Sequence, residues 1–217
     1  PLPKDIFNKR ENSSGYDLTE DENLKRLESS LAKFENTLVD AKSIYVGRVK
    51  SSTSAHKAIS VANNKLIGSV TFDDPSNIEN AITNKSESIW NHFSVDERSK
   101  VLQDIADHIE QEPNQLIFYL INEAGKTIQN AIDEIREAID FLRYYSEQIK
   151  EINKNNELEG PTGEINNISY SNKGRFLCIS PWNFPVAILI GQISAALACG
   201  NNVLIKPSEH TSILGYL

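Results

Sequence analysis

Apolar residues at helical spacing recur over roughly the first 150 positions and predict a pack of amphipathic helices. We expect the first helix over residues 20–36, and others from about Ser76, after Ser94, from Pro113 and from about Thr127. The last of these carries an apolar stripe that we expect to be buried, formed by Ile128, Ile135, Leu142 and Ile149. Its carboxylates Asp133, Glu134 and Glu137 are expected on a solvated face.

Local signals mark where some of these elements begin. Thr19 stands three residues before Glu22, and Ser94 three residues before Glu97, so both pairs have the pattern of a capping box. Short apolar runs predict strands at residues 45–49, 56–61, 66–72 and 165–170.

The pattern changes at residues 174–209, which predict a strand, a helix and a second strand. Arg175–Ile179 is a short apolar run, typical of a strand buried on both faces. Two prolines, Pro181 and Pro185, then break the strand, and residues 186–199 form an apolar helix that Gly200 can end in a left-handed C-cap. Residues 203–205 are expected to be a second buried strand. Two such strands joined by a helix make a right-handed βαβ unit.

Polar side chains follow the ends of these two strands. Asn183 comes just after the first strand, and Lys206 and Glu209 come at the end of the second. Ligands of open α/β sheets bind at the carboxyl ends of the strands, so an amide, an ammonium and a carboxylate can meet there. From spacing alone, a second interpretation stays open: Asn183 is a turn residue, and Lys206 and Glu209 are a solvated pair at a helix start.

Composition and charge argue against several classes of function. The 217 residues carry a formal net charge of -8, which argues against a nucleic-acid surface. No run is long enough for a membrane span, no signal peptide is visible, and no Cys/His spacing indicates a metal site. The two cysteines, Cys178 and Cys199, lie in apolar segments, where we expect buried, inert thiols and hence a reducing, cytoplasmic location.

Three motifs in order carry a resemblance to a known family: Ser180–Pro185 (SPWNFP), Ala195–Asn201 (AALACGN) and Lys206–Glu209 (KPSE). From about Ile59 onward the chain resembles the aldehyde dehydrogenase superfamily. The resemblance implies an α/β fold: the N-terminal part of a Rossmann-type dinucleotide-binding domain, preceded by a helical arm and a helical pack. It also implies Asn183 as the stabiliser of an oxyanion, and a cofactor site at Ile179, Ser180, Pro181, Trp182, Asn183, Lys206, Ser208 and Glu209. A carboxylate at position 209 favours NAD over NADP.

A second resemblance concerns the start of the chain. The stretch RENSSGYDLTEDENL, within residues 10–24, is similar to the segment that leads into the aldehyde dehydrogenase module of proline utilization A enzymes, which are bifunctional. It implies a lead-in arm and helix over residues 1–40, linked to an upstream FAD-dependent proline dehydrogenase module. Residues 41–217 would then be an incomplete NAD-binding domain, with an oligomerisation strand near 164–171 that pairs subunits into a dimer.

The implied reaction is the oxidation of a small aldehyde, L-glutamate γ-semialdehyde, to L-glutamate with NAD. The chain begins at Pro1, contains no Met and shows neither the family's catalytic-cysteine motif nor its general-base glutamate motif. We therefore expect a fragment of a longer enzyme that is inactive by itself. Two alternatives stay open: another NAD(P)-dependent aldehyde dehydrogenase with a different small aldehyde, and a non-catalytic binding or oligomerisation module of the same fold.

Overall fold

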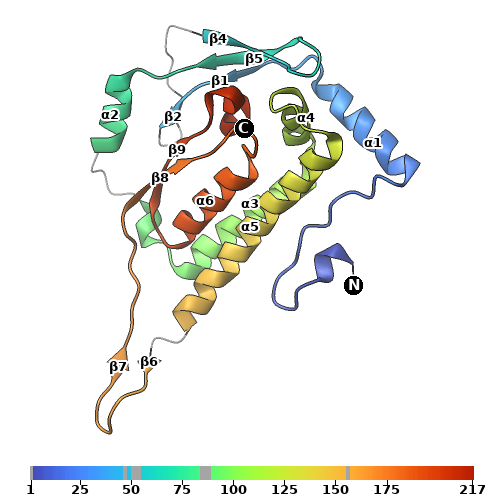
Figure 1. Cartoon of the computed structure of the whole chain (residues 1–217). Helices are drawn as coiled ribbons and strands as arrows, with labels where there is room; N and C mark the ends of the chain where they lie inside the picture. Colours follow the sequence, from blue (N-terminus) through green and yellow to red (C-terminus); the bar gives the residue numbers. More distant parts are fainter. Residues whose placement is uncertain (1, 46–47, 50–54, 84–88, 155–156) are drawn as a thin grey trace.

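The long helix α5 (Ile128–Lys154) is the axis of the fold, against which α3 (Val95–Gln111), α4 (Asn114–Asn122) and α6 (Ala187–Ala198) pack (Figure 1). The computed structural model describes residues 2–45, 48–49, 55–83, 89–154 and 157–217. The core runs along one face of α5, whose buried apolar members are Ala131, Ile132, Ile135, Ala138, Ile139, Leu142 and Ile149. The helical stripe is therefore confirmed, except that Ile128 at its start is more than a third exposed.

The two predicted capping boxes have opposite outcomes. Ser94 caps α3 as predicted, because its side chain accepts from the Glu97 backbone N–H while the Glu97 carboxylate accepts from the Ser94 N–H. The Thr19 box is wrong: the Thr19 N–H and hydroxyl both donate to Asp17, and α1 (Asp21–Leu31) begins after Glu20 without a side-chain cap. A 3-10 turn, Ala32–Phe34, continues α1. Thr19 is therefore engaged in a turn with Asp17 and does not cap α1.

A three-stranded sheet covers one end of the helical pack (Figure 1). Its order is β1 (Val39–Ala41), β5 (Leu66–Thr71), β4 (Ala55–Ile59), with β1 parallel and β4 antiparallel to β5. Gly68 permits the close approach of β1, since a Cβ there would lie 2.1 Å from the Val39 carbonyl oxygen. The helix α7 (Ser212–Tyr216), at the end of the chain, packs against β1, β5 and α4.

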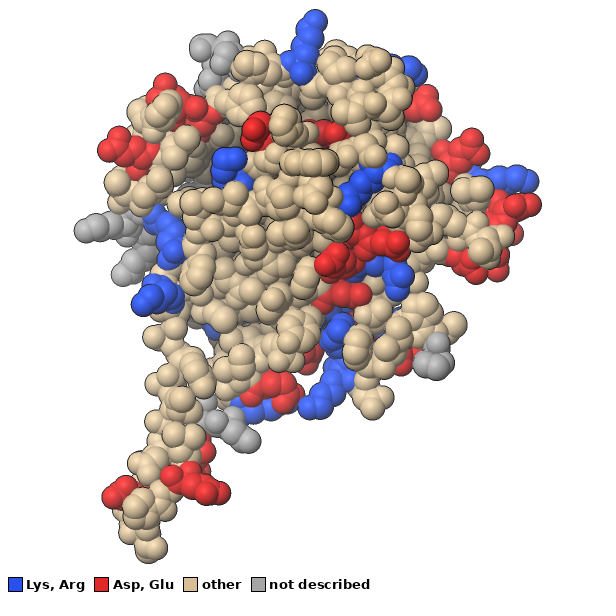
Figure 2. All heavy atoms as spheres, in the orientation of Figure 1, with Lys and Arg blue, Asp and Glu red and all other residues tan. Residues whose placement is uncertain are grey.

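The remaining short elements lie outside these layers. They are the 3-10 turns Pro3–Asp5, Ile89–His92 and Glu209–Thr211, the helix α2 (Pro75–Thr83), and the hairpin strands β2 (Ile44–Tyr45) and β3 (Arg48–Val49). The predicted strand at 165–170 is shorter than expected: β7 is Asn166–Asn167, paired antiparallel with β6 (Glu157–Leu158). This ribbon projects away from the body, with acidic side chains towards its far end (Figures 1 and 2).

The predicted βαβ unit is present. The strands β8 (Arg175–Ile179) and β9 (Asn202–Lys206) are parallel and in register from Arg175 opposite Asn202 to Ile179 opposite Lys206. Gly200 ends α6 with a φ of 76°. Its N–H bonds to the Leu197 carbonyl and the Asn201 N–H to the Ala196 carbonyl, which is a Schellman cap.

The expectation that both strands are buried on two faces is wrong. Of β8, only Cys178 is buried, and Leu177 is 61% exposed; β9 ends in the exposed residues Ile205 and Lys206. The reason is that α6 covers one face of this two-stranded sheet and no described element of the chain covers the other. Apolar composition therefore predicted the strands correctly and their surroundings wrongly.

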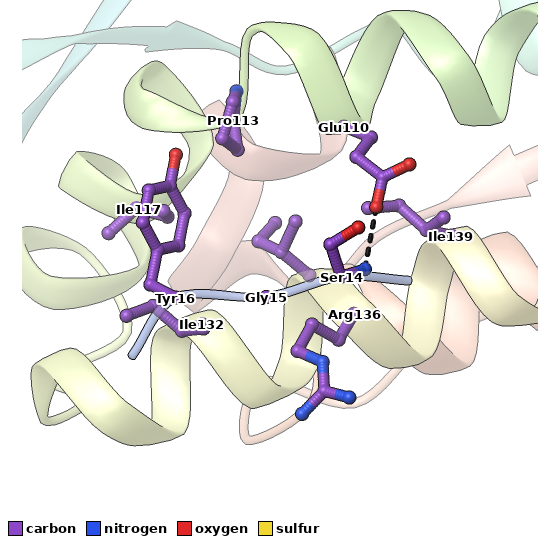
Figure 3. Close-up of a pocket in the computed structure, with 10 residues that line it drawn as sticks. Ser14, Gly15, Tyr16, Glu110, Pro113, Ile117, Ile132, Arg136 and Ile139 are labelled. Atoms are coloured by element: carbon purple, nitrogen blue, oxygen red, sulfur yellow. Dashed lines mark hydrogen bonds between the residues drawn. The ribbon is translucent and has the colours of Figure 1, made fainter. Parts of the chain in front are cut away.

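The N-terminal arm crosses α5 as a strap (Figure 3). The Ser13 N–H and hydroxyl donate to the two carboxylate oxygens of Asp140, at 2.7 and 3.1 Å, and the Ser14 N–H donates to Glu110 at 2.7 Å. Beneath the strap lies a cavity of about 220 Å³, lined by the strap itself, by Glu110 and Pro113, and by side chains of α4 and α5, most of them isoleucines. Burial and these bonds attach the arm to the helical pack. The division of the chain at residue 40 stays a prediction.

Candidate functional site

The site is built at the carboxyl ends of β8 and β9. Ile179 and Lys206 are register partners, and beyond them the Ser180 N–H still donates to the Lys206 carbonyl at 3.3 Å. The chain therefore leaves the sheet at Ser180 and at Pro207 side by side. This is the edge at which parallel sheets bind ligands.

Ser180 is buried at this edge, and its hydroxyl oxygen has no hydrogen-bond partner among the described residues. A neighbouring carbonyl, that of Ile179, accepts from the Gln192 side chain at 3.0 Å, so α6 also fixes the end of β8. The segment that follows, residues 181–186, turns sharply and leads into α6. Pro185 is buried in this turn, whereas Trp182 and Asn183 are exposed.

The second half of the site follows β9. Ser208 is buried and caps the 3-10 turn at Glu209, because its hydroxyl accepts from the His210 N–H at 3.3 Å. Lys206 and Glu209 are exposed, and their charged groups lie 3.9 Å apart. A hydrogen bond from its own backbone N–H, and then the nearby His210 and Lys206, lower the pKa of Glu209, so its carboxylate is ionised. An exposed ionised carboxylate can accept hydrogen bonds from a ligand.

The structure puts the two halves of the site at the same sheet edge. No hydrogen bond joins Asn183 to Lys206 or Glu209 among the described residues. That Asn183, Lys206 and Glu209 share one ligand stays a prediction, as does each role that the resemblance implies for them.

The prediction that Glu134 lies on the solvated face of α5 is wrong. The side chain is buried, with a residue exposure of 1%, and its Oε1 accepts from the N–H groups of Val186, at 2.8 Å, and Ala187, at 3.1 Å. These are amides at the start of α6, where a carboxylate is favoured by the helix dipole. Asp133 and Glu137, in contrast, are exposed as expected.

A lysine completes this arrangement. The Lys126 ammonium lies 2.6 Å from Glu134 Oε2, and also 3.9 Å from the centre of the Phe184 ring, at cation–π distance. Sequence reasoning missed both residues. The signal was present for Glu134, because it falls at helical spacing between the buried Ala131 and Ala138. A carboxylate on an apolar stripe indicates a buried partner.

The cysteines differ from each other. Cys178 is buried as expected, and burial raises the pKa of its thiol. Cys199 is exposed, so the expectation of two buried thiols is wrong; the reason is its place at the C-cap of α6, outside the packed face. Among the described residues, no group of three or more potential ligands gathers to hold a metal ion, and none of their helices combines the length and the apolar character of a membrane span.

Comparison with known proteins places this geometry in a family. The model of the aldehyde dehydrogenase family matches residues 48–217, which is most of the chain. The chain belongs to the aldehyde dehydrogenase family. The α/β class and the N-terminal part of an aldehyde dehydrogenase fold, as predicted, are thereby confirmed.

Members of this family with related sequences are named PutA and 1-pyrroline-5-carboxylate dehydrogenase. The chain is 37% identical over 217 residues to the bifunctional protein PutA of Salmonella typhimurium, covering 99% of this chain and 16% of that protein. It is 31% identical over 202 residues to 1-pyrroline-5-carboxylate dehydrogenase 1 of Halalkalibacterium halodurans, covering 91% of this chain and 39% of that protein.

A solved structure supports the same relationship. The structure of proline utilization A from Bdellovibrio bacteriovorus superposes with a TM-score of 0.90 at 25% identity, over 96% of this chain and 22% of that chain. The chain of this aldehyde dehydrogenase family member thus spans well under half the length of the relatives it matches.

Proposed function

We propose that this chain forms the first part of an NAD-dependent aldehyde dehydrogenase that oxidises L-glutamate γ-semialdehyde to L-glutamate. The observation that carries the proposal is the edge formed by β8 and β9, where the SPWNFP turn and the KPSE segment leave a parallel strand pair together. Sequence similarity to enzymes of proline catabolism over nearly the whole chain supports the substrate.

The residues at this edge fit a dinucleotide. The ionised carboxylate of Glu209 can accept from ribose hydroxyls and would repel a 2′-phosphate, which favours NAD over NADP. Lys206 and Ser208 lie beside it, and Ile179, Ser180, Pro181 and Trp182 line the other strand end. The Ser180 hydroxyl oxygen is buried at this edge and has no hydrogen-bond partner among the described residues. NAD, when bound, supplies the acceptor for the hydride that leaves the aldehyde carbon.

Asn183 has the oxyanion role in this proposal. Its exposed amide can donate to the aldehyde oxygen, whose negative charge grows when a nucleophile adds to the carbonyl carbon. A donor of this kind is worth about 3–4 kcal/mol, or a factor of about 100–1000 in rate. The nucleophile and the base that activates water are not among the residues assigned here, so the 217-residue chain by itself is proposed to be inactive.

The wider assembly follows from the same proposal. The projecting β6–β7 ribbon, with Ile165 80% exposed, offers unpaired backbone that can join a second copy in a dimer. In this proposal a proline dehydrogenase module with FAD precedes the lead-in arm, and the word bifunctional in the name of the PutA relatives supports a second activity. A reducing, cytoplasmic location fits the two free cysteines.

The test is turnover of the full-length gene product. We expect reduction of NAD with L-glutamate γ-semialdehyde, and a fall in kcat of about 100–1000-fold for Asn183→Ala. Glu209→Ala should weaken the preference for NAD over NADP, with little effect on kcat at saturating cofactor. A faster reaction with a different small aldehyde would mean that this aldehyde, and not L-glutamate γ-semialdehyde, is the substrate. No oxidation of any aldehyde would refute the proposal.

A further inference from the structure

Lys126 and Glu134 contact the turn that carries Asn183; the Glu134 side chain is fully buried and the Lys126 side chain is 11% exposed. Phe184 follows Asn183 directly, and its ring is in contact with the Lys126 ammonium. Two residues later, the Val186 N–H donates to Glu134, as does that of Ala187. The segment after Asn183 is thus held at the Phe184 ring and at the backbone amides of Val186 and Ala187.

Both contacts depend on one buried ion pair. The side chain of Glu134 is fully buried and that of Lys126 is 11% exposed, with 2.6 Å between Oε2 and Nζ. Removing either charge would leave the other without compensation, which is strongly unfavourable in a buried site. Substituting one residue should therefore disturb the other residue's contact with the turn.

The pair also has a rigid base. Glu134 lies in the middle of the first half of α5, the helix of 27 residues against which the core packs. Lys126 directly follows Gly125, whose φ of 71° forms the tight connection between α4 and α5. The turn at 181–186 contains no regular secondary structure of its own. These contacts therefore fix its position relative to α5.

We propose that Lys126 and Glu134 are positioning residues that set the Asn183 amide for the aldehyde oxygen. This inference rests on the proposed function of Asn183 and adds two residues that do not touch substrate. A displacement of about 1 Å at a reacting centre can cost about 100-fold in rate, so a loss of the pair should reach Asn183 through the turn.

A double-mutant cycle in the full-length gene product tests this coupling. Glu134→Gln should lower kcat by about 10–100-fold, while the KM for NAD changes by less than about 3-fold because Lys206 and Glu209 lie on another strand end. In the Asn183→Ala background, Glu134→Gln should lower kcat by less than about 3-fold further, since the group it positions is gone. If the kcat losses of the two single variants multiplied in the double variant, Glu134 and Asn183 would act independently, and the proposal would be overturned.

Matched variants separate positioning from folding. Glu137→Gln, on an exposed position of the same helix, should leave kcat unchanged. Lys126→Met should reproduce the Glu134→Gln effect, and Lys126→Arg, which keeps the charge, should recover at least part of kcat. Equal losses for Lys126→Arg and Lys126→Met would contradict a positioning role for the charge.

Hydrogen exchange in the 217-residue chain provides a measurement that needs no turnover. In Lys126→Met and Glu134→Gln, the amides of Val186 and Ala187 should exchange at least about 10-fold faster, while those of Ala138–Leu142 in α5 keep their rates. Faster exchange throughout α5, or unchanged exchange at Val186, would overturn the inference. An inactive wild-type enzyme with this local exchange pattern would refute the proposed function but would leave intact the inference that Lys126 and Glu134 hold the turn.

Discussion

Asn201 holds three backbone groups at once, at the junction of α6, the segment before β8, and β9. Its Oδ1 accepts from the N–H groups of Lys173 and Gly174, at 2.7 and 2.9 Å, and its Nδ2 donates to the Ala196 carbonyl at 3.1 Å. Asn201 is 4% exposed, and Asn201→Ala would remove all three of these hydrogen bonds, leaving the N–H groups of Lys173 and Gly174 without this acceptor. We expect a loss of about 2–4 kcal/mol in the free energy of unfolding, measured by urea denaturation.

A neighbouring asparagine is the matched control for this prediction. Among the described residues, the Asn172 side chain makes one hydrogen bond, from its Nδ2 to the Gly200 carbonyl, and Asn172 is exposed. Asn172→Ala should therefore cost less than about 1 kcal/mol. If the two alanine variants were equally stable, the network around Asn201 would have no special energetic role.

At the same scale, the sequence indicated some polar residues and concealed others. Ser94 and Gly200 were predictable, because a cap needs only a local pattern and a local backbone conformation. The partners of Glu134 and Glu123 could not be predicted, because each carboxylate bonds to backbone N–H groups more than 50 residues away. Only the position of Glu134 on an apolar stripe gave a hint. Long-range pairing leaves little trace in one sequence.

Among the elements, α7 depends on a single carboxylate. Glu123 is buried, and its two oxygens accept from the N–H groups of Ile213 and Leu214, each at 2.9 Å. Burial raises the pKa of Glu123 to about 7, although these two N–H groups act to lower it. Since the pKa is raised in the folded state, folding binds a proton at intermediate pH.

The sign of the pH dependence follows by linkage. The unfolded chain releases this proton near pH 4.5, and the folded chain near pH 7. Glu123 therefore contributes stability that is fully present below about pH 4.5 and is lost as the pH rises to about 7, by about 3 kcal/mol. In urea denaturation between pH 5 and 8, Glu123→Gln should show a smaller fall in unfolding free energy than the wild type. Exposed Glu137→Gln should follow the wild type, and parallel curves for Glu123→Gln would disprove the assignment.

Most helices and strands could be predicted because periodicity and turn residues are local. The boundaries of α3, α4 and α6 agree with the pattern to within a few residues, and the βαβ unit is as expected. The strand expected at 165–170 is short because its residues project from the body, where no packing supports a longer ladder. Tertiary contacts decide how far a strand of weak alternation extends.

For the molecule as a whole, the sequence predicted the fold class but not which faces of the sheet are covered and which are exposed. Apolar strands 175–179 and 203–205 indicated two-sided burial, yet α6 supplies one cover only. The candidate site has the same limit: its motifs put Asn183, Lys206 and Glu209 at strand ends, as observed. The sequence pattern could not predict the contacts that hold the Asn183 turn, because they come from distant segments of the chain, α5 and the α4–α5 connection.

The uncovered sheet predicts how the 217-residue chain behaves in solution. Leu177 and Ile179 lie two residues apart, on the face opposite the buried Cys178, and are 61% and 52% exposed on a strand pair that has no further partner strand among the described residues. Exposed apolar strands with free edges favour pairing with other chains, so we expect self-association at high concentration. Leu177→Lys should shift sedimentation or light scattering towards the monomer, because a charge on the contact face opposes stacking. Ser171→Lys adds the same charge at an exposed polar position outside the strands and should leave the association unchanged. A wild-type chain that stays monomeric, or equal effects of both lysines, would show that this face does not drive association.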